Sequence, residues 1–449
     1  MKKNTLTAAL ALLLGTGLIL GGCTRSQINY QIAEAIGTDG KYENNEPVET
    51  PVMAERRKLL EESESEEASL LTILEEAEKL ALGYNYEEAL SVLDTIPLSQ
   101  ARDERVAEAR ERYEKGDANL VTWEGDIPHL CFPTLIYDTV MAYDGDDKAS
   151  EYNTTMVTCK EFSLILQSLY DNGYILIDIH SIADMVTDER GTSSMEEQKM
   201  KLPEGKRPII LSQDNLNYAD VKNGDGIATK LVLDEDGKVK AQYTDSEGHD
   251  VAGDYDFIPI LDSFIEEHPD FSFRGARGIV SVSGSEGVFG YPITSPAAGS
   301  SADAAEGSST VSSSTQDEKV KAIADALREE GWNIASAGWS HSYMNDMSME
   351  QFTAEIEDWI KYVAPLTGPS DILFYPYGAE VEYPGEKLNF LTGKGFHYLC
   401  GLWGDTDFRE LSDLYMRQTR RFVDGYTLIN APVYFTDFFD ASLIRDDDR

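Results

Sequence analysis

The sequence predicts an α/β protein, with a barrel-like domain of parallel strands preceded by a small α-helical region. From about residue 123 onward, short apolar runs alternate with amphipathic helical patterns. Repeated strand–helix units of this kind favour a parallel sheet. The preceding stretch, 55–118, is acidic, and its apolar residues recur at helical spacing. A chain of 449 residues can hold two or three such domains.

The N-terminus has the pattern of a bacterial lipoprotein leader. Two lysines precede an apolar stretch that ends in the sequence LGGC, with the cysteine at Cys23. A basic start, a short apolar core and small residues before a cleavage point indicate a secretory signal. The alternative is an ordinary signal peptide with an incidental cysteine. We expect a signal peptide at 1–22 and lipidation of Cys23, which would anchor the chain on the extracytoplasmic face of a bacterial cell membrane.

The charge balance excludes one class of partner. The chain has 81 acidic and 38 basic residues, a formal net charge of −43. Because a polyanion would be repelled, we expect no nucleic-acid partner. The same charge is also compatible with a role in solubility alone.

A spacer and a helical region follow the leader. Residues 23–54 are polar and are predicted to be a flexible spacer. Within 55–118, the stretch EEAEKLALGYNYEEALSVLDTI resembles one tetratricopeptide unit. One repeat cannot bury its own apolar face. The region is therefore either a helical hairpin packed on the main domain or part of a surface for a protein partner.

The main domain is predicted to span 123–440. Helices are expected at 158–174, 255–269, 320–332 and 348–366, and a β-hairpin at 229–243. A stretch rich in Ser, Ala and Gly, 295–318, is predicted to be a low-complexity insertion. Strands are expected at 127–137, 175–179, 207–212, 277–284, 333–336, 371–378, 396–404 and 425–433.

One strand end carries candidate catalytic chemistry. The run RPIILS ends in Gln213, Asp214 and Asn215. In α/β barrels, side chains at the C-terminal ends of buried strands form the active site. The order of motifs, from about Ile127 to Pro432, resembles the polysaccharide deacetylases, the NodB homology domain of carbohydrate esterase family four. That resemblance implies a distorted (β/α)7 barrel that removes acetyl groups from N-acetylated sugars with a divalent metal.

The first family motif, T-F-D-D-G, supplies a general base and then a metal ligand. Aligned on it, Asp214 takes the base position, whereas Asn215 replaces the ligand. The second motif, H-S/T-x-x-H, matches the segment ASAGWSHSYMNDMS. Its better register makes His341 the second histidine and Ala337 the first, with Ser348 opening the next helix. The other register would pair His341 with Asn345, and either register keeps one histidine.

The remaining motifs are also altered. The family's R-x-P-x-G corresponds to FYPYGAE without the arginine, and its L-x-H corresponds to a sequence ending in Asn430. Aromatic side chains near strand ends can stack on the apolar faces of sugar rings, although large aromatics are equally often buried. The candidate substrate-binding residues are Trp339, Tyr375, Tyr377, Trp403 and Arg274.

These substitutions bear directly on activity. A catalytic zinc ion needs about three carboxylate or imidazole ligands and a bound water. His341 alone does not meet this need, so we expect no metal cofactor and a lost deacetylase activity, with binding of a cell-wall or surface glycan retained. Two alternatives are an active deacetylase whose zinc is held by other residues, and a scaffold that acts through 55–118.

Overall fold

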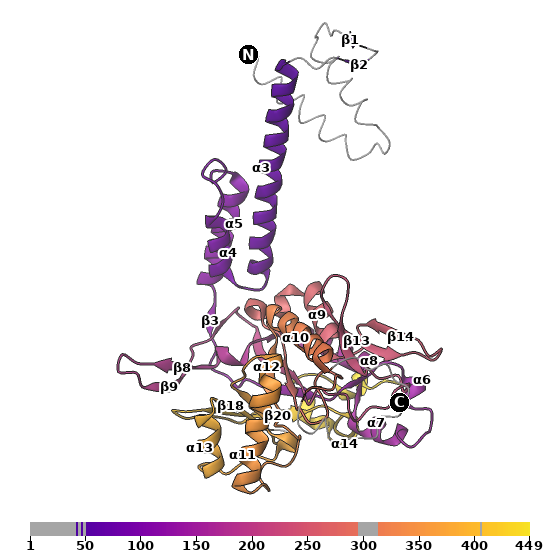
Figure 1. The fold of residues 1–449 in the computed structure, drawn as a ribbon. Coiled ribbons are helices and arrows are strands. Elements are labelled where there is room, and N and C mark those ends of the chain that lie inside the picture. Colours follow the sequence, from indigo (N-terminus) through magenta and orange to yellow (C-terminus); the bar gives the residue numbers. More distant parts are fainter. Residues whose placement is uncertain (1–41, 44–45, 48–50, 295–312, 405) are drawn as a thin grey trace. The chain divides into compact units, whose positions relative to one another are not determined.

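The computed structural model describes residues 42–43, 46–47, 51–294, 313–404 and 406–449 (Figure 1). The leader at 1–22, Cys23 and residues 295–312 of the predicted insertion lie outside these ranges. The chain divides into two compact units, Met1–Leu71 and Thr72–Arg449. Among the described helices, none is long and apolar enough to cross a membrane.

Three helices precede the barrel: α3 (Pro51–Leu82), α4 (Tyr86–Asp94) and α5 (Glu104–Ala118). Helix α3 begins inside the predicted spacer and crosses the boundary between the two units. Within the second unit, the end of α3 is joined to α5 by a hydrogen bond of 2.7 Å from the Tyr113 hydroxyl to Glu78. Ala77, Ala89 and Leu93 are buried there, which agrees with the apolar spacing of the sequence.

Seven parallel strands close into a barrel in the second unit. They pair in the order β15, β16, β17, β18, β20, β4 and β11, and β11 completes the ring by pairing with β15. The predicted distorted (β/α)7-type barrel with a preceding helical region is therefore confirmed. The strands are β4 (His129–Phe132), β11 (Arg207–Gln213), β15 (Ile279–Val282), β16 (Asn333–Ser336), β17 (Ile372–Phe374), β18 (Tyr398–Leu402) and β20 (Met416–Phe422).

The barrel is distorted where β7 (Tyr174–Leu176) joins it. Strand β7 pairs with the start of β11, at Arg207–Ile209, whereas β15 pairs only with Ser212 and Gln213 at its end. Strand β19 (Arg409–Leu411) adds an antiparallel edge to β20. The hairpin predicted at 229–243 is present as β12 (Lys230–Leu233) and β13 (Val239–Thr244), and β14 (Asp250–Gly253) extends it.

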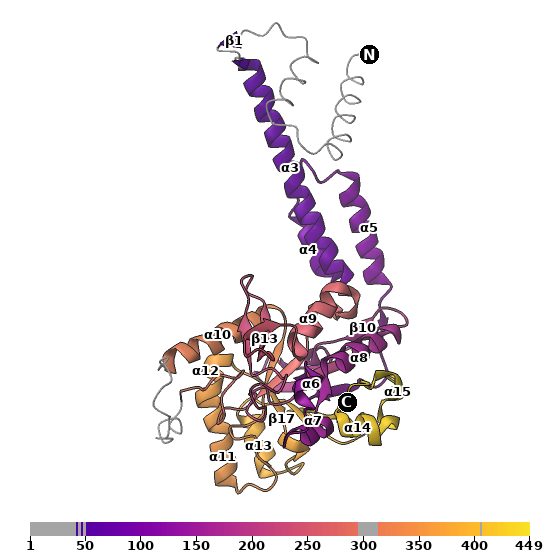
Figure 2. The same ribbon diagram turned by 90° about the vertical axis from the view of Figure 1, so that its right-hand side faces the viewer.

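Helices cover the outside of the strands (Figures 1 and 2). Their apolar faces form one large core with the strands, because β4, β15 and β17 are buried along their whole length. Ser348 caps α11, as the sequence predicts, and Gln351 completes the capping box. The main helices are α8 (Cys159–Asp171), α9 (Phe257–Glu267), α10 (Ser313–Glu329) and α11 (Met349–Asp358).

One predicted element is wrong, and one strand of the barrel was not predicted. The segment 425–433 is not a strand but helix α14 (Gly425–Asn430), which begins at Asp424 with a capping box to Thr427. The strand lies just before it, in β20, where Arg417, Arg420 and Arg421 break the apolar pattern that strand prediction relies on.

Two boundaries also differ from the sequence expectation. Residues 313–318, expected in the low-complexity insertion, begin helix α10. Beyond residue 440, helix α15 (Ala441–Ile444) and the following residues still pack on the barrel domain. There the Arg449 side chain is buried and pairs at 2.6 Å with Glu161, which forms the capping box of α8 with Thr158.

Candidate functional site

Asp214 lies directly after β11, at the C-terminal end of the barrel, where strands from three parts of the chain meet. Its Oδ1 accepts a hydrogen bond of 2.9 Å from the Ser281 hydroxyl on β15. Nη1 of Arg420, on β20, donates to the same oxygen at 3.3 Å. The carboxylate is therefore held by side chains from β15 and β20 rather than free to turn.

Arg420 is fully buried, which is unusual for an arginine. Its guanidinium lies 3.9 Å from the centre of the Phe374 ring, and Nη1 also lies 3.2 Å from Sγ of Cys131. Burial acts to lower the pKa of Arg420, but the Asp214 carboxylate raises it above its usual value. Arg420 therefore stays charged, and Asp214 is its counter-ion.

Asn215 and His341 present polar atoms without partners in the described structure. Both have left-handed backbones, with φ of 45° and 49°. Oδ1 of Asn215 and Nε2 of His341 are buried and make no hydrogen bond there. Burial lowers the pKa of His341, so its imidazole is neutral at neutral pH. Strained backbones and unsatisfied buried atoms are typical of functional positions.

These residues do not fit a catalytic zinc site. Ala337 is buried and follows β16, and its methyl group offers no ligand. Asn215 offers a neutral amide oxygen, which leaves His341 as the one imidazole of the motif. Within the described residues, no group of three His, Cys, Asp or Glu side chains is arranged to hold a metal. The donor set is short of the three ligands that such a site requires.

An exposed aromatic surface adjoins His341. The side chain of Tyr377 is 55% exposed, and its ring stacks on that of Tyr343 with centroids 4.6 Å apart. The same Tyr377 ring lies 4.9 Å from the His341 imidazole. Tyr343 also lines a cavity of about 610 Å³ together with Trp339 and the polar residues Ser340, Ser342, Asp346, Gln351, Glu355 and Asp358.

The other predicted substrate-binding residues do not line this cavity. Tyr375 is completely buried and bonds to the Tyr383 hydroxyl at 2.8 Å, so it belongs to the core. Trp403 is 39% exposed, but its ring stacks on Phe408 at 4.8 Å. Arg274 belongs to a turn that leads into β15, at the opposite end of the barrel strands.

Asn430, at the position of the family's last histidine, is exposed in helix α14. It donates to the Tyr426 carbonyl, as an ordinary helical side chain does. Sequence reasoning missed Arg420, because its strand was not recognised. Tyr343 was also missed, although it lies two residues after His341 in the same motif.

Comparison with known proteins agrees with this geometry. Residues 298–398 match the family model described as polysaccharide deacetylase. Residues 298–398 therefore have the sequence pattern of a polysaccharide deacetylase domain. The matched part of this domain includes Ala337, His341 and Tyr377, whereas Asp214 and Arg420 lie outside it.

Among solved structures, the Streptococcus pyogenes deacetylase PplD in complex with acetate is similar to the chain at 11% identity and a TM-score of 0.38. The similarity covers 68% of this chain and 94% of that one. No curated protein matches the chain. The assignment of the deacetylase domain therefore rests on the family model and on the closed barrel.

Proposed function

We propose that the deacetylase domain binds N-acetylated glycans at the C-terminal end of its barrel and does not carry out metal-dependent deacetylation. The observation that carries the proposal is the pair of side chains at the ligand positions: the amide of Asn215 and the methyl group of Ala337. Without a metal there is no Lewis acid and no water of lowered pKa. A general base alone contributes about 10²- to 10⁴-fold, far less than amide hydrolysis requires.

The surroundings of His341 support glycan binding. Tyr343 and Tyr377 offer stacked aromatic faces, onto which the apolar face of a sugar ring can pack. The adjoining cavity of Trp339 is rich in hydroxyl and carboxylate groups, which suit sugar hydroxyls. Asp214 is paired with Arg420, so in this proposal it holds the site in shape rather than acting as a base.

The test combines metal content, hydrolysis and binding on the same protein. We expect the wild-type chain to bind oligomers of N-acetylglucosamine, release no acetate and contain no stoichiometric zinc. The variant Asn215→Asp with Ala337→His restores two ligands beside His341, so it should gain zinc affinity. Release of acetate would instead establish an active deacetylase, and stoichiometric zinc in the wild type would show that other residues hold a metal.

Tyr377→Ala provides a separate test of the binding surface. Loss of one stacked aromatic ring is expected to weaken oligosaccharide binding about tenfold, since such contacts contribute about 1 kcal/mol or more. Tyr426→Ala is the matched control, because Tyr426 is 56% exposed on α14 and does not line the cavity of Trp339. Equal affinities for both variants would contradict the proposed surface.

We also propose that the protein is a lipoprotein of the bacterial cell envelope, anchored through Cys23. The support is the LGGC sequence after a basic and apolar leader. An anchored glycan-binding domain would act at the surface of the membrane that holds it.

A further inference from the structure

A second cavity, of about 530 Å³, lies at the N-terminal end of the barrel strands. The segments that form it lead into strands: Arg274 to Ala276 precede β15, and Gly331 precedes β16. Asp178 and His180, which follow β7, complete one wall. All lining residues belong to the second unit, and none of them adjoins Asp214 or His341.

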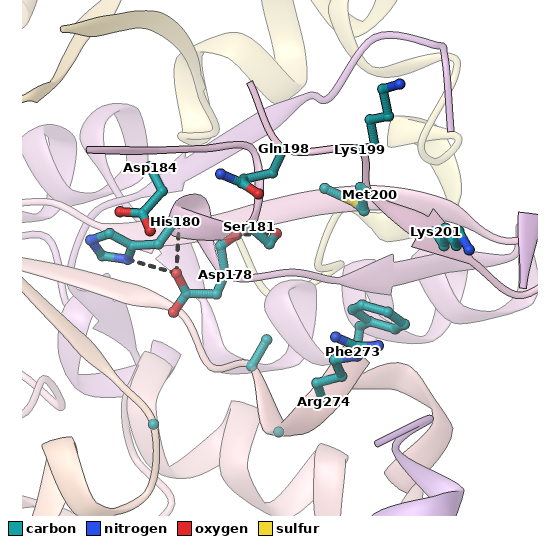
Figure 3. A pocket seen from close by; sticks show the side chains of 13 residues that line it. Asp178, His180, Ser181, Asp184, Gln198, Lys199, Met200, Lys201, Phe273 and Arg274 are labelled. Carbon is teal, nitrogen blue, oxygen red and sulfur yellow. Dashed lines mark hydrogen bonds and ion pairs between the residues drawn. The ribbon is translucent and has the colours of Figure 1, made fainter. Parts of the chain in front are cut away.

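Three cations that line this cavity have no counter-ion in the described part of the chain. Lys199, Lys201 and Arg274 are exposed, and none of them forms an ion pair with another described residue. This is notable in a chain with a formal net charge of −43, where many other basic side chains are paired with carboxylates. The acidic residues of the cavity do not neutralise them, because they are on the His180 side (Figure 3).

The acidic side chains on the His180 side of the cavity are largely paired with other residues. His180 is clamped between two carboxylates, at 2.7 Å from Asp178 and 3.1 Å from Asp371. The second oxygen of Asp178 accepts from Asn333 at 2.7 Å. Asp184 is the one lining carboxylate for which no partner is described. The cavity therefore has more unpaired positive than negative charge.

Contacts within the protein fix the position of Arg274 beside the cavity. Its backbone is left-handed, with φ of 54°, and its N–H donates to the Gly83 carbonyl at 2.6 Å. The guanidinium lies over the Phe273 ring, 5.2 Å from its centre. Figure 3 shows Phe273 and Arg274 on one side of the cavity and Met200 and Lys201 on the other, while Lys199 extends away.

We propose that this cavity binds a small anionic ligand with a phosphate or carboxylate group, held between Arg274 and Lys201 against Phe273. The planar guanidinium of Arg274 matches both oxyanions through paired N–H donors, and the Lys201 ammonium adds a point charge. The Phe273 ring, 7% exposed, is a floor for the apolar part of the ligand. The site is independent of the glycan site at the other end of the barrel.

The test is a calorimetric titration of the full chain at low ionic strength with inorganic phosphate, with acetate and with uncharged N-acetylglucosamine. Arg274→Gln should weaken anion binding about tenfold, the effect of losing one charge-assisted interaction of about 1.4 kcal/mol. Lys201→Gln should weaken it less, and Asp184→Asn should leave it equal or tighter because one repulsive charge is removed. Binding of phosphate alone would identify a phosphate site, and binding of both anions a general oxyanion site.

The matched control is Arg445→Gln, which removes an exposed arginine far along the chain from the cavity. Its anion affinity should equal that of the wild type, and thermal unfolding of each variant checks that the fold is intact. The proposal is overturned if the wild type binds neither anion, or if Arg274→Gln and Lys201→Gln bind as tightly as Arg445→Gln. The proposed glycan site lies at the other end of the barrel. A failure to bind glycans would therefore not affect the result of the anion titration.

Discussion

At the scale of single residues, the ion pair between Asp214 and Arg420 is the feature on which the candidate site depends. Arg420 is fully buried and Asp214 is 12% exposed. If one of the two charges is removed, water cannot reach the other to solvate it, so the loss is costly. Ser281 fixes the carboxylate from one side and supports the backbone N–H of Asn215 from the same hydroxyl. The ion pair therefore stabilises the barrel and also fixes the shape of the C-terminal end, where the candidate site lies.

Asp214→Asn should lower the free energy of unfolding by about 3 kcal/mol, because it leaves the buried charge of Arg420 without a counter-ion. Urea unfolding at neutral pH measures this. Asp214→Asn with Arg420→Met removes both charges, so its loss should be smaller than the sum of the two single losses. Additive losses would mean that the two side chains do not stabilise each other.

His180 gives the fold a dependence on pH at the opposite end of the barrel. Burial acts to lower its pKa, but hydrogen bonds to Asp178 and Asp371 outweigh this and raise the pKa to about 10. Because the folded-state pKa lies above the unfolded value of about 6.5, the stabilising effect is complete below pH 6.5 and is lost as the pH rises to about 10. Its size is reduced by solvent screening, since the side chain is 35% exposed.

We therefore expect stability to fall between pH 6.5 and 10 in the wild type, and to fall less steeply in His180→Gln. Thermal unfolding across this range provides the measurement. His249→Gln is the control, because His249 lies in an exposed turn and should keep the wild-type slope. An unchanged slope in His180→Gln would show that the clamp does not contribute.

At the scale of elements, the position of Trp339 depends on the end of β15. Gly284 follows this strand, and its N–H donates to the Trp339 carbonyl at 2.9 Å. A Cβ at Gly284 would overlap the Trp339 ring and lie 2.6 Å from Val363. The absence of a side chain here is what lets the tryptophan pack against the strand end while it lines its cavity.

Gly284→Ala should displace Trp339, with a loss of about 1 to 3 kcal/mol in unfolding free energy from overpacking. It should also change tryptophan fluorescence and weaken oligosaccharide binding. Gly393→Ala is the control, since a Cβ there meets nothing within 4 Å. Wild-type glycan affinity in Gly284→Ala would remove Trp339 from the proposed binding surface.

The strands show which elements the sequence patterns predict and which they do not. The apolar runs of β4, β11, β15 and β17 predict buried parallel strands, and the structure has them. Strand β20 escapes prediction because its arginines are neutralised by Asp214, Glu380 and Asp407, which all lie outside the strand. The position of Asp214 at a strand end follows from its sequence, whereas the partnership with Arg420 depends on tertiary pairing that a local pattern does not contain.

At the scale of the whole molecule, the net charge and the leader together suggest how the protein would be attached to a membrane. A chain with a formal charge of −43 is repelled by anionic surfaces, so it has no electrostatic means of staying at a membrane with anionic lipids. Membrane association would then depend on acyl chains, and stable anchoring takes more than one chain.

Cys23→Ala removes the thiol that would carry the lipid, so the protein should move from the membrane fraction to the soluble fraction of the envelope. The measurement is fractionation of cells that express each form, together with metabolic labelling by a fatty acid. Cys159→Ala is the matched control, because that cysteine is buried at the start of α8 and should not affect labelling. If Cys23→Ala stays in the membrane fraction after a wash with high salt, acyl chains on Cys23 are not what holds it there, and the leader acts as an uncleaved anchor or a partner retains the chain.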